Sequence, residues 1–333
     1  MKVLLVKTSS LGDVVHALPA ITDAKKNHPE IQFDWVVEEA FSEIPAWHPA
    51  VNEVIPVAMR RWRKSWIKSL RSEEFKTIKA RIQQPYDLVI DAQGLVKSAL
   101  LTRLNSGPRY GLDKHSAREP AAAWFYQHKI SVAKGQHAIE RVRQLLAQIF
   151  NYDVPDALDY GLSSWREGKP EKAIVFFHAT TWVTKHWPEM HWVSLAKIAV
   201  NAGFAVWLPW GNEEEKVRAE RIAKASGAEV LPRLSLTEVA KTLAKAQGVI
   251  GVDTGLCHLA AALAVPSVTI YGATKPALTG TKGHGQLHLS ANFHCSPCLK
   301  KQCTEPSNSV FPVCYETVSP EKVWESYCKV VSR

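Results

Sequence analysis

The chain has 333 residues, of which 46% are hydrophobic and 22% are charged, and its formal net charge is +9. Such a composition excludes general disorder and provides enough apolar surface for two domains. We find no run near the ~20 apolar residues that span a bilayer, and the start M-K-V-L-L-V-K-T-S-S lacks the pattern of a secretory signal, so a cytoplasmic globular protein is expected.

The first half alternates short apolar runs with helical patterns. Strands are predicted at residues 2–7, 32–37 and 87–91, and their continuous apolar character favours parallel strands covered on both faces. A polar stretch at residues 162–171 then predicts an interdomain linker.

The pattern restarts in the second half. Strands are predicted at 173–178, 204–209, 248–253 and 267–271, with helices near 189–202, 212–226 and 235–246. Ser319 and Pro320 open a last helix as its cap and first residue. We therefore expect an α/β protein with domains at 1–160 and 161–318, and a C-terminal helix at 319–333 packing back toward the first domain.

The first strand ends in T-S-S-L-G-D before a helical pattern begins. Nucleotide-binding folds often place G-x-G-x-x-G at such a junction, but only Gly12 stands here, beside Asp13. As a carboxylate at a helix N-terminus, Asp13 could simply stabilise the helix, by about 0.3–1 kcal/mol. It could also be a general base kept ionised by that helix end.

The second half carries two candidate anion sites. Thr180, Thr181 and Lys185 follow a strand and suit a diphosphate, although a capping turn with an exposed lysine fits the spacing equally well. In D-T-G-L-C-H, Asp253 could accept hydrogen bonds from sugar hydroxyls or cap a helix, and Thr254 and Gly255 could approach a phosphate. Two strand ends facing one another across a cleft would make a composite site.

Basic residues gather in R-R-W-R-K at 60–64, with Trp62 inside the run and Trp66 after it. This combination suits an acidic partner such as nucleic acid or an anionic membrane. The plainer alternatives are a solvated helix face for the charges and a buried core position for each tryptophan.

Four cysteines form C-x2-C-x4-C-x10-C: Cys295, Cys298, Cys303 and Cys314. In a reducing compartment this pattern favours a structural zinc site or free thiols over disulfides. No D-x-D, Walker loop, G-x-S-x-G or H-E-x-x-H is present. A nucleic-acid binder lacks its usual motifs here, and a dehydrogenase lacks its glycine fingerprint.

Taken together, the motifs resemble the ADP-heptose glycosyltransferases that build the inner core of bacterial lipopolysaccharide (glycosyltransferase family 9). The resemblance rests on V-K-T-S-S-L-G-D-V-V-H-A-L-P-A, R-R-W-R-K, I-D-A-Q-G-L-V-K-S-A-L, A-R-E-P, H-A-T-T with K-H-W-P, and V-D-T-G-L-C-H-L, in the family's order from residue 1 to about 275. R-R-W-R-K and D-A-Q-G-L-V-K-S are closer to the type I branch, whereas the cysteine-rich tail also occurs in type II-like relatives.

The resemblance implies a GT-B fold of two Rossmann-like domains, the first binding the acceptor and the second ADP-heptose. It implies inverting transfer of L-glycero-D-manno-heptose to Kdo of Kdo2-lipid A, without a catalytic metal and on the cytoplasmic face of the inner membrane. Asp13 matches the catalytic base. Thr180, Thr181 and Lys185 match diphosphate contacts, Glu215 a ribose contact, and Asp253, Thr254, Gly255 and His258 the donor motif. Ser10, Gly12, Arg60, Arg61, Arg63, Lys64 and Arg118 match acceptor positions.

Two alternatives stay open within the family. The acceptor could be a heptosylated one, as for type II, or a single phosphorylated Kdo. From its place on an alanine-rich helix, His258 would be packed with its ring nitrogens satisfied. No nucleic-acid partner is expected.

Overall fold

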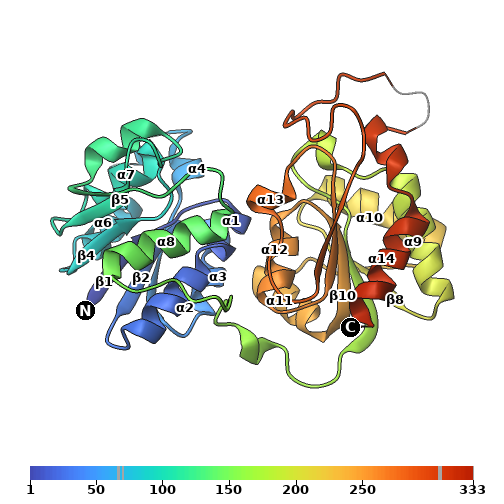
Figure 1. Cartoon of the computed structure of the whole chain (residues 1–333), viewed down its shortest axis with the longest axis horizontal. Coiled ribbons are helices and arrows are strands. Elements are labelled where there is room, and N and C mark those ends of the chain that lie inside the picture. Colours follow the sequence, from blue (N-terminus) through green and yellow to red (C-terminus); the bar gives the residue numbers. More distant parts are fainter. Residues whose placement is uncertain (66–67, 70, 307–309, 333) are drawn as a thin grey trace. The chain divides into compact units, whose positions relative to one another are not determined.

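The structure is a computed structural model that describes residues 1–65, 68–69, 71–306 and 310–332. The chain divides into two compact units, Met1–Leu162 and Ser163–Arg333 (Figure 1). Within the described ranges, no helix is long and apolar enough to cross a membrane.

A six-stranded parallel sheet, in the order β3-β2-β1-β4-β5-β6, forms the centre of the first unit. Its strands are β1 (Lys2–Val6), β2 (Gln32–Glu38), β3 (Val51–Val57), β4 (Leu88–Asp91), β5 (Arg109–Leu112) and β6 (His128–Ile130). Its helices are α1 (Leu11–Val15), α2 (Leu18–Asn27), α3 (Glu43–Ala46), α4 (Met59–Trp62), α6 (Glu73–Ile82), α7 (Val96–Thr102) and α8 (Ala138–Phe150), with 3-10 turns η1 (Glu39–Phe41) and η2 (Pro120–Phe125).

A second sheet of six parallel strands, in the order β12-β11-β10-β7-β8-β9, forms the other unit. Its strands are β7 (Glu171–Phe177), β8 (Ala205–Leu208), β9 (Glu229–Val230), β10 (Ala246–Val252), β11 (Ser267–Tyr271) and β12 (Gln286–Ser290). Its helices are α9 (Glu189–Asn201), α10 (Glu213–Ser226), α11 (Leu236–Lys245), α12 (Gly255–Ala262), α13 (Pro276–Thr279) and α14 (Pro320–Val331), with 3-10 turns η3 (Ser163–Trp165), η4 (Val183–Lys185) and η5 (Val313–Thr317).

The predicted central strands are confirmed. Val3, Leu4, Leu5 and Val6 of β1 are all fully buried, although alternate side chains of a strand point to opposite faces. Both faces of the sheet are therefore covered there, as the continuous apolar run predicts. Both sheets have the strand order of a doubly wound nucleotide-binding fold, so the expectation of two Rossmann-like units is also confirmed.

The C-terminal helix packs within the second unit. Ser319 caps α14 by accepting a hydrogen bond from the Lys322 amide at 3.3 Å, as predicted. Val323 and Tyr327 are fully buried in the core of the second unit, so α14 is part of that unit. The apolar face of α14 finds its partners on α9 and β11.

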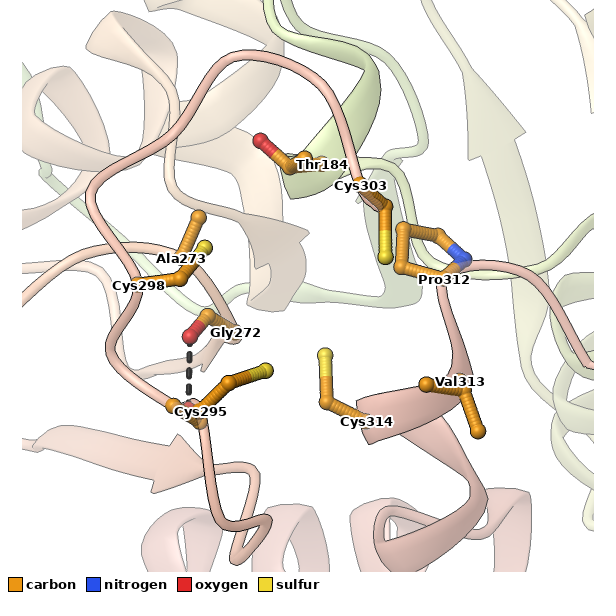
Figure 2. Close-up of a pocket in the computed structure, with 10 residues that line it drawn as sticks. Thr184, Gly272, Ala273, Cys295, Cys298, Cys303, Pro312, Val313 and Cys314 are labelled. Carbon is orange, nitrogen blue, oxygen red and sulfur yellow. Dashed lines mark hydrogen bonds between the residues drawn. The ribbon is translucent and has the colours of Figure 1, made fainter. Parts of the chain in front are cut away.

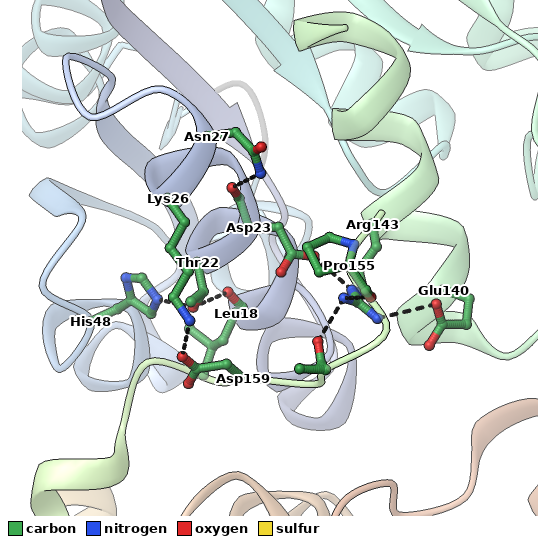
Figure 3. Close-up of polar contacts among 11 residues, drawn as sticks. Leu18, Thr22, Asp23, Lys26, Asn27, His48, Glu140, Arg143, Pro155 and Asp159 are labelled. Carbon is green, nitrogen blue, oxygen red and sulfur yellow. Dashed lines mark hydrogen bonds and ion pairs between the residues drawn. The ribbon is translucent and has the colours of Figure 1, made fainter. Parts of the chain in front are cut away.

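Buried polar contacts hold residues 155–161, the last segment of the first unit, in place (Figure 3). Arg143 on α8 forms an ion pair with Asp23 on α2 at 2.6 Å, and both side chains are 3% exposed. The same guanidinium donates to the carbonyls of Pro155 and Ala157. Gly161 has φ of +70° and lies against His48, where any side chain would collide with the imidazole. These contacts hold residues 155–161 on α2 and α8.

Candidate functional site

The first turn of α1, which follows the loop after β1, carries the Asp13 carboxylate. The Ser10 amide and hydroxyl both donate to Asp13 Oδ2, at 2.8 and 3.1 Å. A carboxylate at the third helical position that accepts from the cap amide is half of a capping box. The interpretation of Asp13 as a helix-capping group is therefore confirmed, and it leaves a catalytic role open.

Gln93, which follows β4, clamps this loop from the neighbouring strand. Its Oε1 accepts hydrogen bonds from the Thr8 amide at 2.7 Å, the Thr8 hydroxyl at 2.9 Å and the Ser9 amide at 3.2 Å. Its Nε2 donates to the Ser9 carbonyl at 2.6 Å. The amide group of Gln93 thus fixes the backbone that leads into Asp13.

A polar pocket of about 450 Å³ opens beside the loop. It is lined by Ser9, Ser10, Asp13, Gln93, Leu95, Lys97, Arg118 and Glu119. The pocket brings Asp13 together with Ser10 and Arg118, which the sequence analysis assigned to one acceptor site. Two cationic side chains beside a carboxylate suit an acceptor that carries negative charge.

The basic run at 60–64 is more heterogeneous than its sequence indicates. Arg61 forms ion pairs with Glu39 at 3.0 Å and Glu74 at 2.6 Å, and these hydrogen bonds raise the pKa of its guanidinium. Trp62 is a core residue that packs edge-on against Phe75, as the buried-core alternative predicts. Arg60, Arg63 and Lys64 are exposed, whereas Trp66 lies outside the described residues.

In the second unit, Lys185 and Asp253 meet where β7 and β10 end. Lys185 Nζ lies 2.7 Å from Asp253 Oδ2, and the two side chains are 17% and 8% exposed. Thr274 also donates to Asp253 Oδ2 at 2.5 Å, and the Thr180 hydroxyl donates to the Asp253 carbonyl at 3.2 Å. Lys185 is therefore not the exposed lysine of the capping alternative, and the Asp253 carboxylate holds Lys185 and Thr274.

The remaining donor-site candidates lie on or next to helices of the second unit or close to Lys185 in sequence. Thr254 is the cap residue of α12, and Gly255 is its first residue. His258 is buried on α12, as the packing interpretation predicts. Glu215 on α10 accepts a hydrogen bond from the Gly211 amide at 2.7 Å, and Thr181 is exposed. The structure thus brings Thr180 and Lys185 into contact with Asp253. Glu215 lies apart from them in the first turn of α10.

The four tail cysteines line one pocket of the second unit (Figure 2). All are free thiols. Burial and the neighbouring sulfurs raise the pKa of the Cys314 thiol to about 12.

Comparison with known proteins identifies the family. The sequence profile of glycosyltransferase family 9 (heptosyltransferase) matches residues 75–308. The chain is 53% identical over 340 aligned positions to lipopolysaccharide heptosyltransferase 1 of Pseudomonas aeruginosa, covering 97% of this chain and 96% of that one. The chain belongs to glycosyltransferase family 9.

Solved structures of heptosyltransferases agree with this assignment. The E. coli heptosyltransferase WaaC with ADP superimposes with a TM-score of 0.88 at 44% identity, covering 99% of this chain and 100% of that one. WaaC with ADP-2-deoxy-2-fluoro heptose gives a TM-score of 0.80 at 48% identity, covering 88% and 94% of the two chains. The GT-B fold is therefore confirmed.

The type I resemblance is confirmed as well. Against the 53% identity above, lipopolysaccharide heptosyltransferase 2 of Salmonella typhimurium is 22% identical, covering 88% of this chain and 90% of that one. This heptosyltransferase is an enzyme of lipopolysaccharide biosynthesis, so the alternatives of a noncatalytic nucleic-acid binder and of a dehydrogenase are wrong.

Sequence reasoning missed several residues that shape the family's site in this chain. Gln93 and Lys97 lie in the D-A-Q-G-L-V-K motif that carried the resemblance, but no role was assigned to either. Thr274, which holds Asp253, follows β11 without any motif. Lys7 is buried and donates to the Ala92 carbonyl at 3.0 Å. Burial lowers its pKa, which Asp13 and Asp91 oppose. The lysine at the end of the apolar run V-L-L-V-K, directly before T-S-S, was the one signal in the sequence that could have pointed to Lys7.

Proposed function

We propose that this enzyme transfers L-glycero-D-manno-heptose from ADP-heptose to a hydroxyl of Kdo in Kdo2-lipid A, with inversion at the anomeric carbon. The observation that carries the proposal is the pocket of the first unit that Asp13 lines together with Lys97 and Arg118. Its cations suit the carboxylates and phosphates of such an acceptor, and its carboxylate can accept a hydroxyl proton.

Asp13 takes the proton in this mechanism. Both hydrogen bonds from Ser10 end on Oδ2, so Oδ1 is the oxygen that we assign to the acceptor hydroxyl. A carboxylate is a weak base toward a free alcohol, but the hydroxyl becomes acidic as its oxygen attacks the anomeric carbon. The new carbon–oxygen bond forms opposite the bond to ADP, which breaks, and one displacement inverts the centre.

Lys185 and the threonines at 180 and 181 balance the negative charge that develops on the departing diphosphate. An ammonium group has three donors, so Lys185 can keep its contact with Asp253 and still donate to a phosphate oxygen. Donors fixed before the reaction stabilise the charge that grows in the transition state. Because the Lys185 ammonium supplies this positive charge, we propose that transfer needs no catalytic metal, and it is expected to proceed without added Mg²⁺ or Mn²⁺.

A transfer assay tests the proposal. Purified enzyme is given ADP-heptose with either Kdo2-lipid A or an acceptor that already carries one heptose. Heptosylated product is expected from Kdo2-lipid A alone. Product from only the heptosylated acceptor would support a type II acceptor. A lipid A acceptor with a single phosphorylated Kdo, the other alternative, is assayed as a third substrate.

The Asp13→Asn variant tests the base in the same assay. Transfer is expected to be abolished while ADP-heptose binding persists, because the amide keeps the shape but cannot take a proton. Asp156→Asn, at an exposed carboxylate of the same unit, is the matched control and should be fully active. Near-normal turnover by Asp13→Asn would remove Asp13 from the mechanism.

We further propose that the enzyme works at the cytoplasmic face of the inner membrane, bound through exposed cations at 60–64. Arg61 is matched by two glutamates, so Arg60, Arg63 and Lys64 are the relevant charges. Each cation near an anionic surface contributes about 1 kcal/mol. Replacing Arg63 and Lys64 by glutamine should weaken sedimentation with phosphatidylglycerol vesicles, and unchanged binding would refute this surface.

A further inference from the structure

The segment between β12 and η5 brings four thiols to one place. Cys295, Cys298 and Cys303 come from its described loop and Cys314 from η5, and all four line a cavity of about 10 Å³. In Figure 2 the sulfurs of Cys295, Cys303 and Cys314 point toward a common space. A cavity of this size holds about one water molecule or a single ion.

Only the start of this loop is packed in a hydrophobic core: Ala291 is buried there and Phe293 packs against it. The described residues from 294 to 306 form no helix or strand, and Leu299 is 58% exposed. Hydrogen bonds fasten it instead: the Leu299 amide donates to the Ala273 carbonyl at 2.8 Å, and Ser296 donates to the Gly272 carbonyl at 2.6 Å. A segment that buries so little apolar surface gains order from a covalent or metal cross-link.

The ligand chemistry selects the ion. We propose that Cys295, Cys298, Cys303 and Cys314 bind one zinc ion in a closed, structural site. Four cysteine sulfurs in tetrahedral arrangement are the preferred set for structural zinc, and C-x2-C spacing lets two of them reach the same ion. Four protein ligands fill the coordination sphere of a structural zinc ion and leave no open position for a substrate.

A competing set of ligands lies beside the cluster. Ligand atoms of His294, Cys295 and Glu305 all lie within 4.8 Å of one another. The His294 side chain is 67% exposed, however, and its Nε2 already lies 3.2 Å from Glu305 Oε2. Cys295 belongs to both sets, and the four thiols are the better zinc site because the competing set offers only three ligands, one of them mostly exposed.

The zinc-bound loop would brace the proposed donor site. The Thr184 hydroxyl donates to the Lys300 carbonyl at 2.6 Å, and the Tyr315 hydroxyl donates to the Thr184 carbonyl at 3.2 Å. Thr184 precedes Lys185, and Gly272 and Ala273 precede Thr274, which holds Asp253. Thus residues adjacent to Lys185 and to Thr274 contact the loop. The bracing role rests on the proposed function, whereas zinc binding itself does not.

Metal analysis of freshly purified, reduced enzyme tests the zinc site. One zinc per chain is expected in the wild type, with loss of zinc in Cys298→Ser and in Cys303→Ser. Cys328→Ser, at an exposed thiol outside the cluster, is the matched control and should keep its zinc. His294→Ala should also keep it, and loss of zinc in that variant would overturn the four-thiolate assignment.

A second measurement uses only the wild type, in case the serine variants fail to fold. Refolding with Co²⁺ in place of zinc should give the strong near-ultraviolet absorption of cobalt–thiolate bonds and the visible bands of tetrahedral cobalt. Enzyme that neither contains zinc nor shows these bands would overturn the proposal. One iron per chain, bound by the same thiols, would overturn the choice of zinc.

The link to the donor site has its own readout. Where Cys298→Ser folds, its affinity for ADP should fall several-fold while Cys328→Ser binds ADP as the wild type does. Loss of zinc with unchanged ADP affinity would contradict the bracing role and leave the metal site standing.

Discussion

Lys185 is the residue on which the proposed chemistry of the second unit depends most. Its ammonium lies over the Trp182 ring at 4.7 Å and beside Asp253, so an aromatic face and a carboxylate together fix its position. A fixed cation loses little entropy when the diphosphate arrives, which is the condition for electrostatic preorganisation.

Replacing Lys185 by alanine should lower the transfer rate by about 100-fold or more, because the departing diphosphate loses its main donor. Lys301 also lies over the Trp182 ring, at 5.6 Å, so Lys301→Ala is a matched control that should change the rate little. Steady-state transfer with saturating acceptor measures both. An unchanged rate in Lys185→Ala would reduce Lys185 to a structural partner of Asp253.

His48 makes the stability of the first unit depend on pH. Burial lowers the pKa of its imidazole from 6.5 to about 4, although Asp159 opposes the shift. The unfolded chain therefore binds the proton more readily, and stability present above pH 6.5 is lost as the pH falls toward 4. Between pH 7.5 and 5 this residue should cost about 2 kcal/mol.

Denaturation midpoints at pH 7.5 and 5 measure this loss. His48→Gln should flatten the pH dependence, since glutamine can still bond to Thr22 and does not titrate. His115→Gln, at an exposed histidine, should leave the dependence unchanged. Equal pH dependence in the wild type and His48→Gln would assign the loss to other groups, such as His178, whose pKa burial lowers to about 3.

At the scale of elements, the loop between β1 and α1 is positioned by β4. This loop lacks the glycines of a phosphate-binding loop. Hydrogen bonds of Gln93 with the Thr8 amide and the Ser9 carbonyl fix its backbone instead. Gln93→Leu should therefore displace Asp13 and lower kcat by about 10- to 100-fold, with ADP affinity unchanged.

Gln93→Glu provides the matched variant for this clamp. Its carboxylate can still accept from the Thr8 and Ser9 amides but cannot donate to the Ser9 carbonyl, so an intermediate kcat is expected. Equal effects of both variants on kcat and on ADP affinity would indicate general misfolding and contradict a positioning role for Gln93.

Helices α2 and α8 are joined by the buried Asp23–Arg143 pair. Removing one partner leaves the other charge buried, so Arg143→Met should lower the free energy of unfolding of this unit by about 3–5 kcal/mol. The double variant Asp23→Leu with Arg143→Met removes both charges and should recover most of that loss. Chemical denaturation followed by circular dichroism compares the wild type, Asp23→Leu, Arg143→Met and the double variant, and additive losses would contradict coupling.

Much of this architecture could be predicted because its central strands are apolar on both faces. β1 contains the run V-L-L-V and β7 the run A-I-V-F-F, and a helical pattern follows each of them. β3 contains Pro56, β5 and β6 are short, and β12 is an edge strand with polar residues. Such strands are defined by their neighbours in the sheet, which the local sequence does not record.

The site was readable to a similar extent. Asp13, Lys185 and Asp253 stand in motifs at strand ends, where parallel sheets bind ligands. Their partners were not readable: Thr274 and Gln93 act through hydrogen bonds to residues distant in sequence, and Arg61 is neutralised by two glutamates from other elements. Pairings of this kind depend on the fold. A run of basic residues in the sequence does not show which of them are paired with acidic residues from other elements.

At the scale of the whole molecule, the two units share one topology but carry different chemistry. The first presents the Asp13 carboxylate in a pocket that Lys97, Arg118 and Glu119 also line, and the second presents Lys185 paired with Asp253 where two strands end. If this division is also a division of substrates, a donor fragment should act on the second unit even when no acceptor is present.

Hydrogen exchange with ADP alone tests this division. ADP should slow exchange in peptides covering 178–186 and 252–258, because the diphosphate satisfies amides at those strand ends. Lys185→Ala should weaken the protection, and UDP serves as a control for recognition of the base. Slowed exchange at 8–14 and 90–97, without any in the second unit, would reverse the assignment, since ADP would then occupy the pocket that Asp13 lines.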